Sequence, residues 1–209
     1  MRKTIILLGV YLFFAQALAA QNEINSFVLS AGKSWHGTGD LDGLVAEVCY
    51  EHYIAKLVSF STALTTTIHY GKDDGFNDQS PGITPDTRLM RFTTAGLQIS
   101  SLVNFAVLSL TAHKIQIGAG PLLRFQSTSH PSQYGYYQNQ GSFPEPFYVI
   151  YDPGKQNTIT AGFGLSLMYL AKINKKYQVG IKASFQNDTN SDVLTAVSLI
   201  LCRKLPHLR

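Results

Sequence analysis

The chain has 209 residues, of which 14% are charged and 45% hydrophobic, and its formal net charge is +4. Arg2 and Lys3 lie in a segment that we expect to be removed, so +4 less these two leaves +2, too little to indicate a nucleic acid or an acidic substrate. The mean hydropathy of +0.03 permits a membrane β-barrel, because lipid-facing and interior residues alternate along its strands and offset each other.

Residues 1–20 have the layout of a secretory signal peptide. Arg2 and Lys3 precede an apolar run over 5–15, and Ala17-Leu18-Ala19 forms a small-x-small cleavage signal. The run is too short to span a bilayer as a helix, and no second apolar helix follows. We therefore expect residues 21–209 to be exported as one domain, and we expect no helical membrane protein.

The segment 115–129 alternates between an apolar face and a face of small or polar residues. Its apolar face consists of Ile115, Ile117, Ala119, Pro121, Leu123 and Phe125. This pattern is typical of a membrane-spanning β-strand. Similar alternation predicts seven further strands, at 26–35, 44–54, 58–70, 89–103, 158–170, 177–186 and 193–202. Arg91 interrupts the outward face of the 89–103 strand, and residues 105–114 are expected to form a long apolar turn.

The connections alternate between short and long. Short turns are predicted at 55–56 and 172–176, whereas 71–88 and 128–157 are long polar loops rich in turn formers. Short turns on the periplasmic side and long loops outside follow the outer-membrane rule. The predicted fold is all-β, an eight-stranded antiparallel up-and-down transmembrane β-barrel with a lumen filled by side chains.

Two segments, GAGPLLRF at 118–125 and GFGLSLMY at 162–169, look like recurrent segments of a known family. On these the chain resembles the small outer-membrane β-barrel domains of Gram-negative bacteria, the OmpA/OmpX-like eight-stranded barrels. The resemblance implies an outer-membrane protein with a structural or surface-interaction role. Pro121 departs from the pattern, because a proline inside a closed sheet loses a ladder hydrogen bond, and the ending LCRKLPHLR replaces the expected terminal aromatic.

Strand parity directs four charged side chains into the lumen: Glu47, Glu51, Arg124 and Lys182. Burial of a lone charge is costly, so we predict that Glu47 contacts Arg124 or Lys182 and that Glu51 lies near Lys182 or water. The alternative is that a wet lumen hydrates each charge separately. Cys49 and Cys202 are predicted at different heights of the barrel, which disfavours a disulfide between them.

The loop 128–157 carries seven aromatic residues beside glycines and prolines. They are Tyr134, Tyr136, Tyr137, Phe143, Phe147, Tyr148 and Tyr151. Rigid aromatics in such a setting are typical of recognition surfaces, although they can also pack on one another or lie at the lipid headgroups. We predict outer-membrane lipid as one partner and a surface ligand or protein, bound through the extracellular loops, as another.

Candidate catalytic and metal sites are weak. Ser127, Ser129 and His130 form a serine–histidine cluster without a placed carboxylate, the predicted strands keep His52 and His69 apart, and the acidic segment 72–78 lacks EF-hand spacing. We predict no catalytic residues, no cofactor, no metal and no nucleic-acid partner. A lipid-modifying hydrolase on the same barrel and a soluble lipocalin-like ligand-binding barrel are the alternatives.

Overall fold

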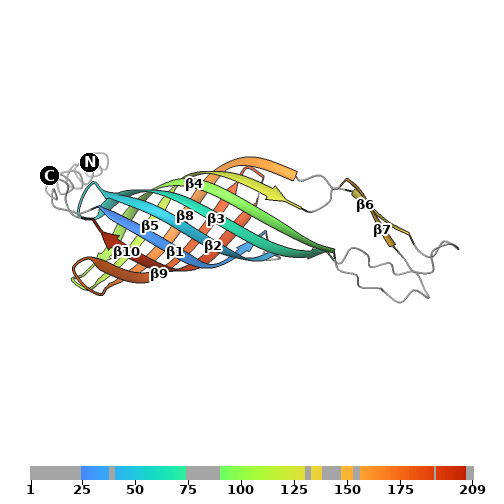
Figure 1. Ribbon diagram of the computed structural model, residues 1–209. Helices are drawn as coiled ribbons and strands as arrows, with labels where there is room; N and C mark the ends of the chain where they lie inside the picture. Colours follow the sequence, from blue (N-terminus) through green and yellow to red (C-terminus); the bar gives the residue numbers. More distant parts are fainter. Residues whose placement is uncertain are drawn as a thin grey trace, which may run out of the picture.

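The computed structural model describes residues 25–37, 41–73, 90–129, 133–137, 147–152, 156–190 and 192–205. Eight of the strands close into a barrel in which every neighbouring pair is antiparallel (Figure 1). Around the barrel they are β1 (Ser26–His36), β10 (Val193–Lys204), β9 (Tyr177–Asp188), β8 (Gln156–Lys172), β5 (His113–Thr128), β4 (Met90–Ser109), β3 (Val58–Asp73) and β2 (Leu41–Tyr53). The predicted eight-stranded up-and-down barrel is confirmed. No helix in these ranges is long and apolar enough to cross a membrane.

The outer surface of the barrel is a belt of large apolar side chains. Each strand contributes at least one exposed member, such as Leu29, Val48, Leu64, Ile99, Leu123, Leu165, Ile181 and Leu199. The residues between them point inward and are mostly small or polar, as Ser30 and Gln98 are. An exposed apolar surface of this extent suits lipid as its neighbour. The apolar face does not point inward, as the soluble lipocalin-like alternative requires.

Strand β4 is longer than predicted. It continues through Phe105 to Ser109, with a β-bulge between Ala106 and Leu108 that shifts its register against β5. The prediction of a long apolar turn over 105–114 is therefore wrong, because the in-and-out alternation continues past Val103 and the bulge absorbs the irregular residue. The phase of β4 agrees with the prediction over 95–103, whereas the side chain of Arg91 lies outside the described residues.

Pro121 lies inside β5, opposite Phe163 of β8. On the β4 side the ladder is interrupted at this point, since Ser100 pairs with Leu122 and the next pair is Val103 with Ala119. Pro121 has no backbone N–H, and it thus lies at a gap in the β4–β5 ladder where no donor is needed.

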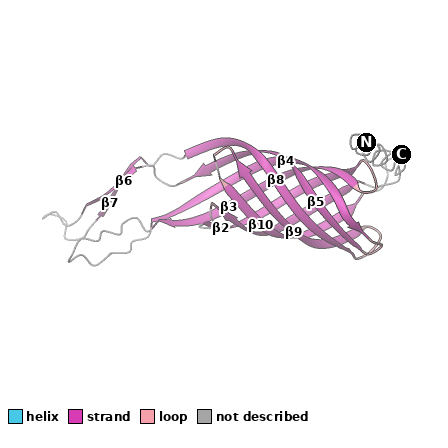
Figure 2. Cartoon of the chain, turned by 180° about the vertical axis from the view of Figure 1, so that it is seen from behind, coloured by secondary structure: helices cyan, strands magenta, loops and turns pink. Residues whose placement is uncertain are grey.

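The first and last residues that the structure describes before and after the barrel strands, Asn25 and Leu205, are hydrogen-bonded at one end of the barrel, here called the inner end. A β-hairpin projects from the other end, the outer end (Figures 1 and 2). The hairpin consists of β6 (Gln133–Tyr137) and β7 (Phe147–Asp152), which pair only with each other among the described strands. It occupies part of the segment predicted as the loop 128–157. At the inner end, residues 54–57, 110–112 and 173–176 make short turns, as the predicted loop pattern requires.

Cys49 and Cys202 are free and buried. Both are register partners of Val28, one from β2 and the other from β10. They therefore lie in one row across β2, β1 and β10, and this row slopes along the barrel axis because the strands of a barrel are tilted. What separates them is strand β1: two inter-strand spacings amount to about 10 Å, beyond the reach of a disulfide.

Candidate functional site in the barrel lumen

Polar side chains fill the lumen in three layers, at Glu51 near the inner end, at Glu47 and Lys182 in the middle, and at Arg124 toward the outer end. Cavities of about 40 Å³ and 20 Å³ separate them. Such volumes hold one or a few water molecules. The described part of the lumen is therefore a polar core packed around small cavities.

The inner layer is built around the carboxylate of Glu51, which is 1% exposed. One oxygen accepts hydrogen bonds from Ser59 Oγ at 2.5 Å and Gln116 Nε2 at 2.7 Å, and the other from Ser26 Oγ at 3.1 Å and Tyr53 OH at 3.0 Å. Neutral donors from β1, β2, β3 and β5 therefore surround Glu51, where we expected Lys182 or water. Four hydrogen bonds from protein offset much of the cost of burying this carboxyl group.

Lys114 extends this layer toward the inner end. Its Nζ donates a hydrogen bond to Tyr53 OH at 3.0 Å and lies 4.3 Å from the centroid of the same ring. Tyr53 thus links a lysine near the inner rim to the buried Glu51. The chain of contacts joins β2 and β5, which are not neighbours in the barrel.

The middle layer is an ion pair. Lys182 Nζ lies 2.5 Å from Glu47 Oε1, and Thr65 Oγ1 donates to the other oxygen at 3.2 Å. Both charged side chains are only 11–12% exposed. Strands β2 and β9 are separated by β1 and β10 in the barrel, so the pair crosses the lumen and ties two distant walls together. Of the two partners expected for Glu47, the structure brings Lys182 to it.

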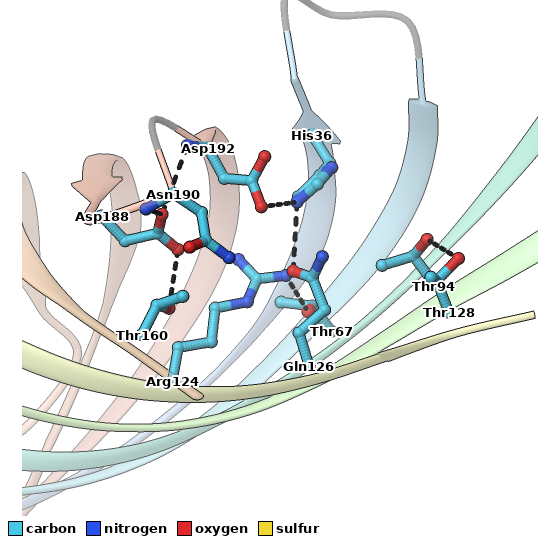
Figure 3. A network of polar contacts seen from close by, with 10 residues as sticks. All are labelled: His36, Thr67, Thr94, Arg124, Gln126, Thr128, Thr160, Asp188, Asn190 and Asp192. Carbon is cyan, nitrogen blue, oxygen red and sulfur yellow. Dashed lines mark hydrogen bonds and ion pairs between the residues drawn. The ribbon is translucent and has the colours of Figure 1, made fainter. Parts of the chain in front are cut away.

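Arg124 lies in the outer layer, apart from Glu47. It is 2% exposed, and its Nη2 donates to Thr67 Oγ1 at 3.4 Å. The guanidinium points toward the β9–β10 turn, where Asp188 and Asp192 lie (Figure 3). Asp188 is held by Thr160 Oγ1 at 2.8 Å. The positive charge of Arg124 therefore faces carboxylates at the end of β9 and just before β10, and not the expected Glu47.

Two histidines complete the outer layer. His36 Nε2 is 3.7 Å from Asp192 Oδ2 and 3.2 Å from Gln126 Oε1 (Figure 3). Its ring lies 5.3 Å from that of His69, whose Nε2 is 2.9 Å from Ser34 Oγ. The sequence predicts an inward face for His69 and a turn at His36, but it gives no partner for either histidine. Their partners come from β1, β5 and the β9–β10 turn, so local spacing does not reveal them.

Gly96 makes room for the Arg124 guanidinium. A Cβ there would lie 2.8 Å from Thr67 Oγ1 and 2.9 Å from Arg124 Nη2. We expect Gly96→Ala to displace this layer and lower the free energy of unfolding by about 1–3 kcal/mol, measured by urea titration in detergent. Gly164→Ala is the matched control, because its nearest side-chain atoms would be 3.6 Å and 3.8 Å away, an ordinary contact. Equal losses from both substitutions would contradict this account.

The predicted recognition residues lie mostly on the hairpin. Tyr134, Tyr136 and Tyr137 belong to β6, and Phe147, Tyr148 and Tyr151 belong to β7. Tyr136 is the register partner of Tyr148, and Tyr137 of Phe147. Phe143 lies outside the described residues.

Only part of the serine–histidine cluster lies among the described residues. Ser129 Oγ accepts a hydrogen bond from the backbone N–H of Thr93 at 2.9 Å, and His130 lies outside the described residues. His52 faces outward beside Asn25, far from the lumen histidine His69. No group of three potential metal ligands occurs among the residues described.

The same barrel architecture occurs in solved outer-membrane proteins. Neisserial surface protein A (NspA) aligns with a TM-score of 0.56 and 10% identity over 87% of this chain and 97% of its own. Ail of Yersinia pestis, solved with the heparin analogue sucrose octasulfate, gives 0.54 and 7% over 88% and 99%, and OprG of Pseudomonas aeruginosa gives 0.50 and 7% over 88% and 95%. No family model and no curated protein sequence matches the chain. The chain thus has the fold of eight-stranded outer-membrane β-barrels.

Proposed function

We propose that this chain is an integral outer-membrane protein of a Gram-negative bacterium with a non-enzymatic, structural or surface-interaction role. The observation that carries the proposal is the combination of an apolar outer belt with a packed polar lumen. An apolar belt on a closed barrel suits lipid, and eight strands leave an interior that side chains fill. Residues 1–20 would act as the export signal, removed from the barrel domain 21–209.

The filled lumen favours a role at the surface over a role in transport. Each layer has a contact that crosses the interior: Gln116 to Glu51, Lys182 to Glu47, and Gln126 to His36. The hairpin of β6 and β7 extends the chain beyond the outer end of the barrel. We therefore assign surface recognition to this hairpin and its aromatic residues, with a protein or another surface ligand as the partner.

A hairpin deletion tests this proposal in intact cells. Thr128 and Gln156 are register partners, so replacing 130–155 by a short glycine-rich turn should leave the barrel closed. We expect both proteins in the outer-membrane fraction, both migrating faster on gels when unheated, because a closed barrel resists unfolding. Protease added to intact cells should cut within 130–155 only in the full chain, whereas the outer loop 71–88 should be cut in both proteins. Only the full chain should bind immobilised surface proteins or glycans.

The outcomes separate the parts of the proposal. Recovery of either protein as a folded, detergent-free monomer would contradict the membrane location. Cleavage confined to 172–176 in intact cells would mean that the barrel has the opposite orientation. Equal binding by both proteins would remove the recognition role from the hairpin.

A further inference from the structure

The two ends of the barrel differ in charge. At the inner end the exposed or half-exposed side chains include Lys56, Lys172, Lys175, Lys176, Arg203 and Lys204. Among the described residues, the one carboxylate at this end is that of Glu51, which is buried and held by neutral donors. Asp42, Asp188 and Asp192 lie at the outer end. The described inner end is therefore positively charged.

Five of these cations come together where β8, β9 and β10 meet the inner rim. They are Lys172, Lys175, Lys176, Arg203 and Lys204, here called the inner basic patch. The backbone N–H of Lys204 donates to the backbone oxygen of Lys176 at 2.8 Å, so the end of β10 lies against the β8–β9 turn. No described carboxylate forms an ion pair with any of the five. An anionic ligand would therefore relieve their mutual repulsion.

The turn that carries Lys175 and Lys176 has a fixed backbone. Asn174 Oδ1 accepts hydrogen bonds from the backbone N–H groups of Lys176 at 2.8 Å and Tyr177 at 2.9 Å. The backbone oxygen of Tyr177 accepts from the N–H groups of Ile173 and Asn174 at 3.1 Å and 3.2 Å. Because the turn is ordered before a ligand arrives, binding loses little backbone entropy there. Ile173, in the same turn, is an apolar side chain that is 61% exposed.

Arg203 lies in a row of aromatic residues on the outer wall. Its register partners are Phe27 of β1 and Tyr177 of β9, and Phe27 is also paired with Tyr50 of β2. The next outward row toward the outer end is apolar and exposed, and consists of Leu29, Leu201 and Val179. Aromatic residues that border the apolar belt mark the headgroup level of a membrane barrel. The guanidinium of Arg203 thus belongs at the level of the lipid headgroups.

We propose that the inner basic patch binds the phosphate of an anionic glycerophospholipid of the phosphatidylglycerol type, with its acyl chains against the apolar belt. The proposal rests on the proposed membrane location and orientation, which put the inner end in the periplasmic leaflet, a leaflet of phospholipids. The guanidinium of Arg203 can donate two parallel hydrogen bonds to a phosphate, and the lysines add positive charge.

The charge and position of the patch select this lipid over other ligands. A choline or ethanolamine headgroup carries its own cation, which the five cations repel. An acidic periplasmic protein would have to enter the headgroup region to reach Arg203, whereas a lipid is already at that level. An exposed Ile173 among the lysines also suits a membrane surface.

Two tryptophan reporters compare the ends of the barrel. Trp35, the only tryptophan in the sequence, lies at the outer end beside Lys33, whose charge is offset by Asp42 at 3.1 Å. The inner reporter is a variant with Trp35→Phe and Tyr177→Trp, which puts the single tryptophan next to Arg203.

Each mature protein is folded into phosphatidylcholine vesicles that contain the same small fraction of one brominated lipid, either phosphatidylglycerol, phosphatidylethanolamine or phosphatidylcholine. The bromines lie near the headgroup end of the acyl chains. At the inner reporter we expect brominated phosphatidylglycerol to be enriched about fivefold over either zwitterionic lipid, the effect of about one basic side chain near a charged surface. At Trp35 the three lipids should quench alike. Both leaflets have the same composition, so the result does not depend on orientation.

Further variants of the inner reporter assign the enrichment to the patch. Lys175→Gln combined with Lys176→Gln, and separately Arg203→Gln, should bring the ratio close to one, and high salt should lower it. Lys56→Gln is the matched control. It removes the same charge at the same end, but from the turn between β2 and β3, which β1 and β10 separate from β9. The ratio is taken within each variant, so a change in the tryptophan environment cancels.

Failure of this proposal is distinguishable from failure of the membrane location. If no brominated lipid quenches either reporter, the barrel is not inserted and the proposed location fails. If all three lipids quench the inner reporter equally, the location stands and the lipid site is overturned, which leaves an acidic periplasmic protein as the ligand to test. Enrichment that persists in both charge variants, or that Lys56→Gln removes as fully as they do, would also overturn the site.

Discussion

Lys182→Met is expected to lower the free energy of unfolding by about 3–5 kcal/mol, because it leaves the carboxylate of Glu47 buried without its cation. Glu47 and Lys182 are both nearly nine-tenths buried and in direct contact. Glu47→Gln together with Lys182→Met should cost less than the sum of the single substitutions by at least about 1 kcal/mol. Urea unfolding of the four proteins in detergent micelles measures this coupling.

The exposed pair of Lys33 and Asp42 is the control for this cycle. It has the same charges at a similar distance but lies half or more exposed, so its removal should cost no more than about 1 kcal/mol. A second control combines Glu47→Gln with Arg124→Met, whose effects should add because the two residues lie in different layers. Additive effects for Glu47 and Lys182 would mean that water, and not the ion pair, stabilises each charge.

Glu51→Leu is expected to lower the free energy of unfolding by at least about 3 kcal/mol, because it leaves buried donors from Ser26, Ser59 and Gln116 without an acceptor. Tyr53 loses the same acceptor. Adding Ser59→Ala and Gln116→Leu to Glu51→Leu should restore much of the loss, since removal of both partners of a buried hydrogen bond is far less costly than removal of one.

Thermal unfolding of Glu51→Leu and of the triple variant in detergent checks this expectation. Ser59→Ala alone serves as the matched single deletion, and it should have a smaller effect because Gln116 still donates to the same Glu51 oxygen. A triple variant less stable than Glu51→Leu would show that the donors have a role beyond satisfying the carboxylate.

The strands could be predicted because period-2 alternation is a local property of the sequence. Parity also directs Glu47, Glu51 and Lys182 inward without knowledge of the fold. Which of them meet depends on the tilt and stagger of the strands, which no single strand contains. Parity therefore could not distinguish Lys182 from Arg124 as the partner of Glu47.

Other features of the lumen and the strands could not be predicted from alternation alone. The donors to Glu51 are neutral, so a search for opposite charges misses Ser59 and Gln116. Asp188 and Asp192 flank a turn, where parity does not apply. The bulge after Ala106 breaks the alternation that would have extended β4, and the pairing of β6 with β7 joins residues within a segment whose glycines and prolines indicate a loop.

The place of Cys49 and Cys202 on either side of β1 has a consequence for how the chain reaches its folded state. On the proposed route to the outer membrane the chain crosses the periplasm, which is kept oxidising. In an unfolded chain these two thiols are free to meet and form a disulfide. Their backbones in the finished barrel are about 10 Å apart across two strand spacings, so a chain linked in this way cannot close the sheet. Once the barrel is formed, both thiols are buried in its interior and shielded from oxidants. Productive assembly thus requires that the barrel closes faster than the two thiols oxidise, or that a reductant reduces the disulfide.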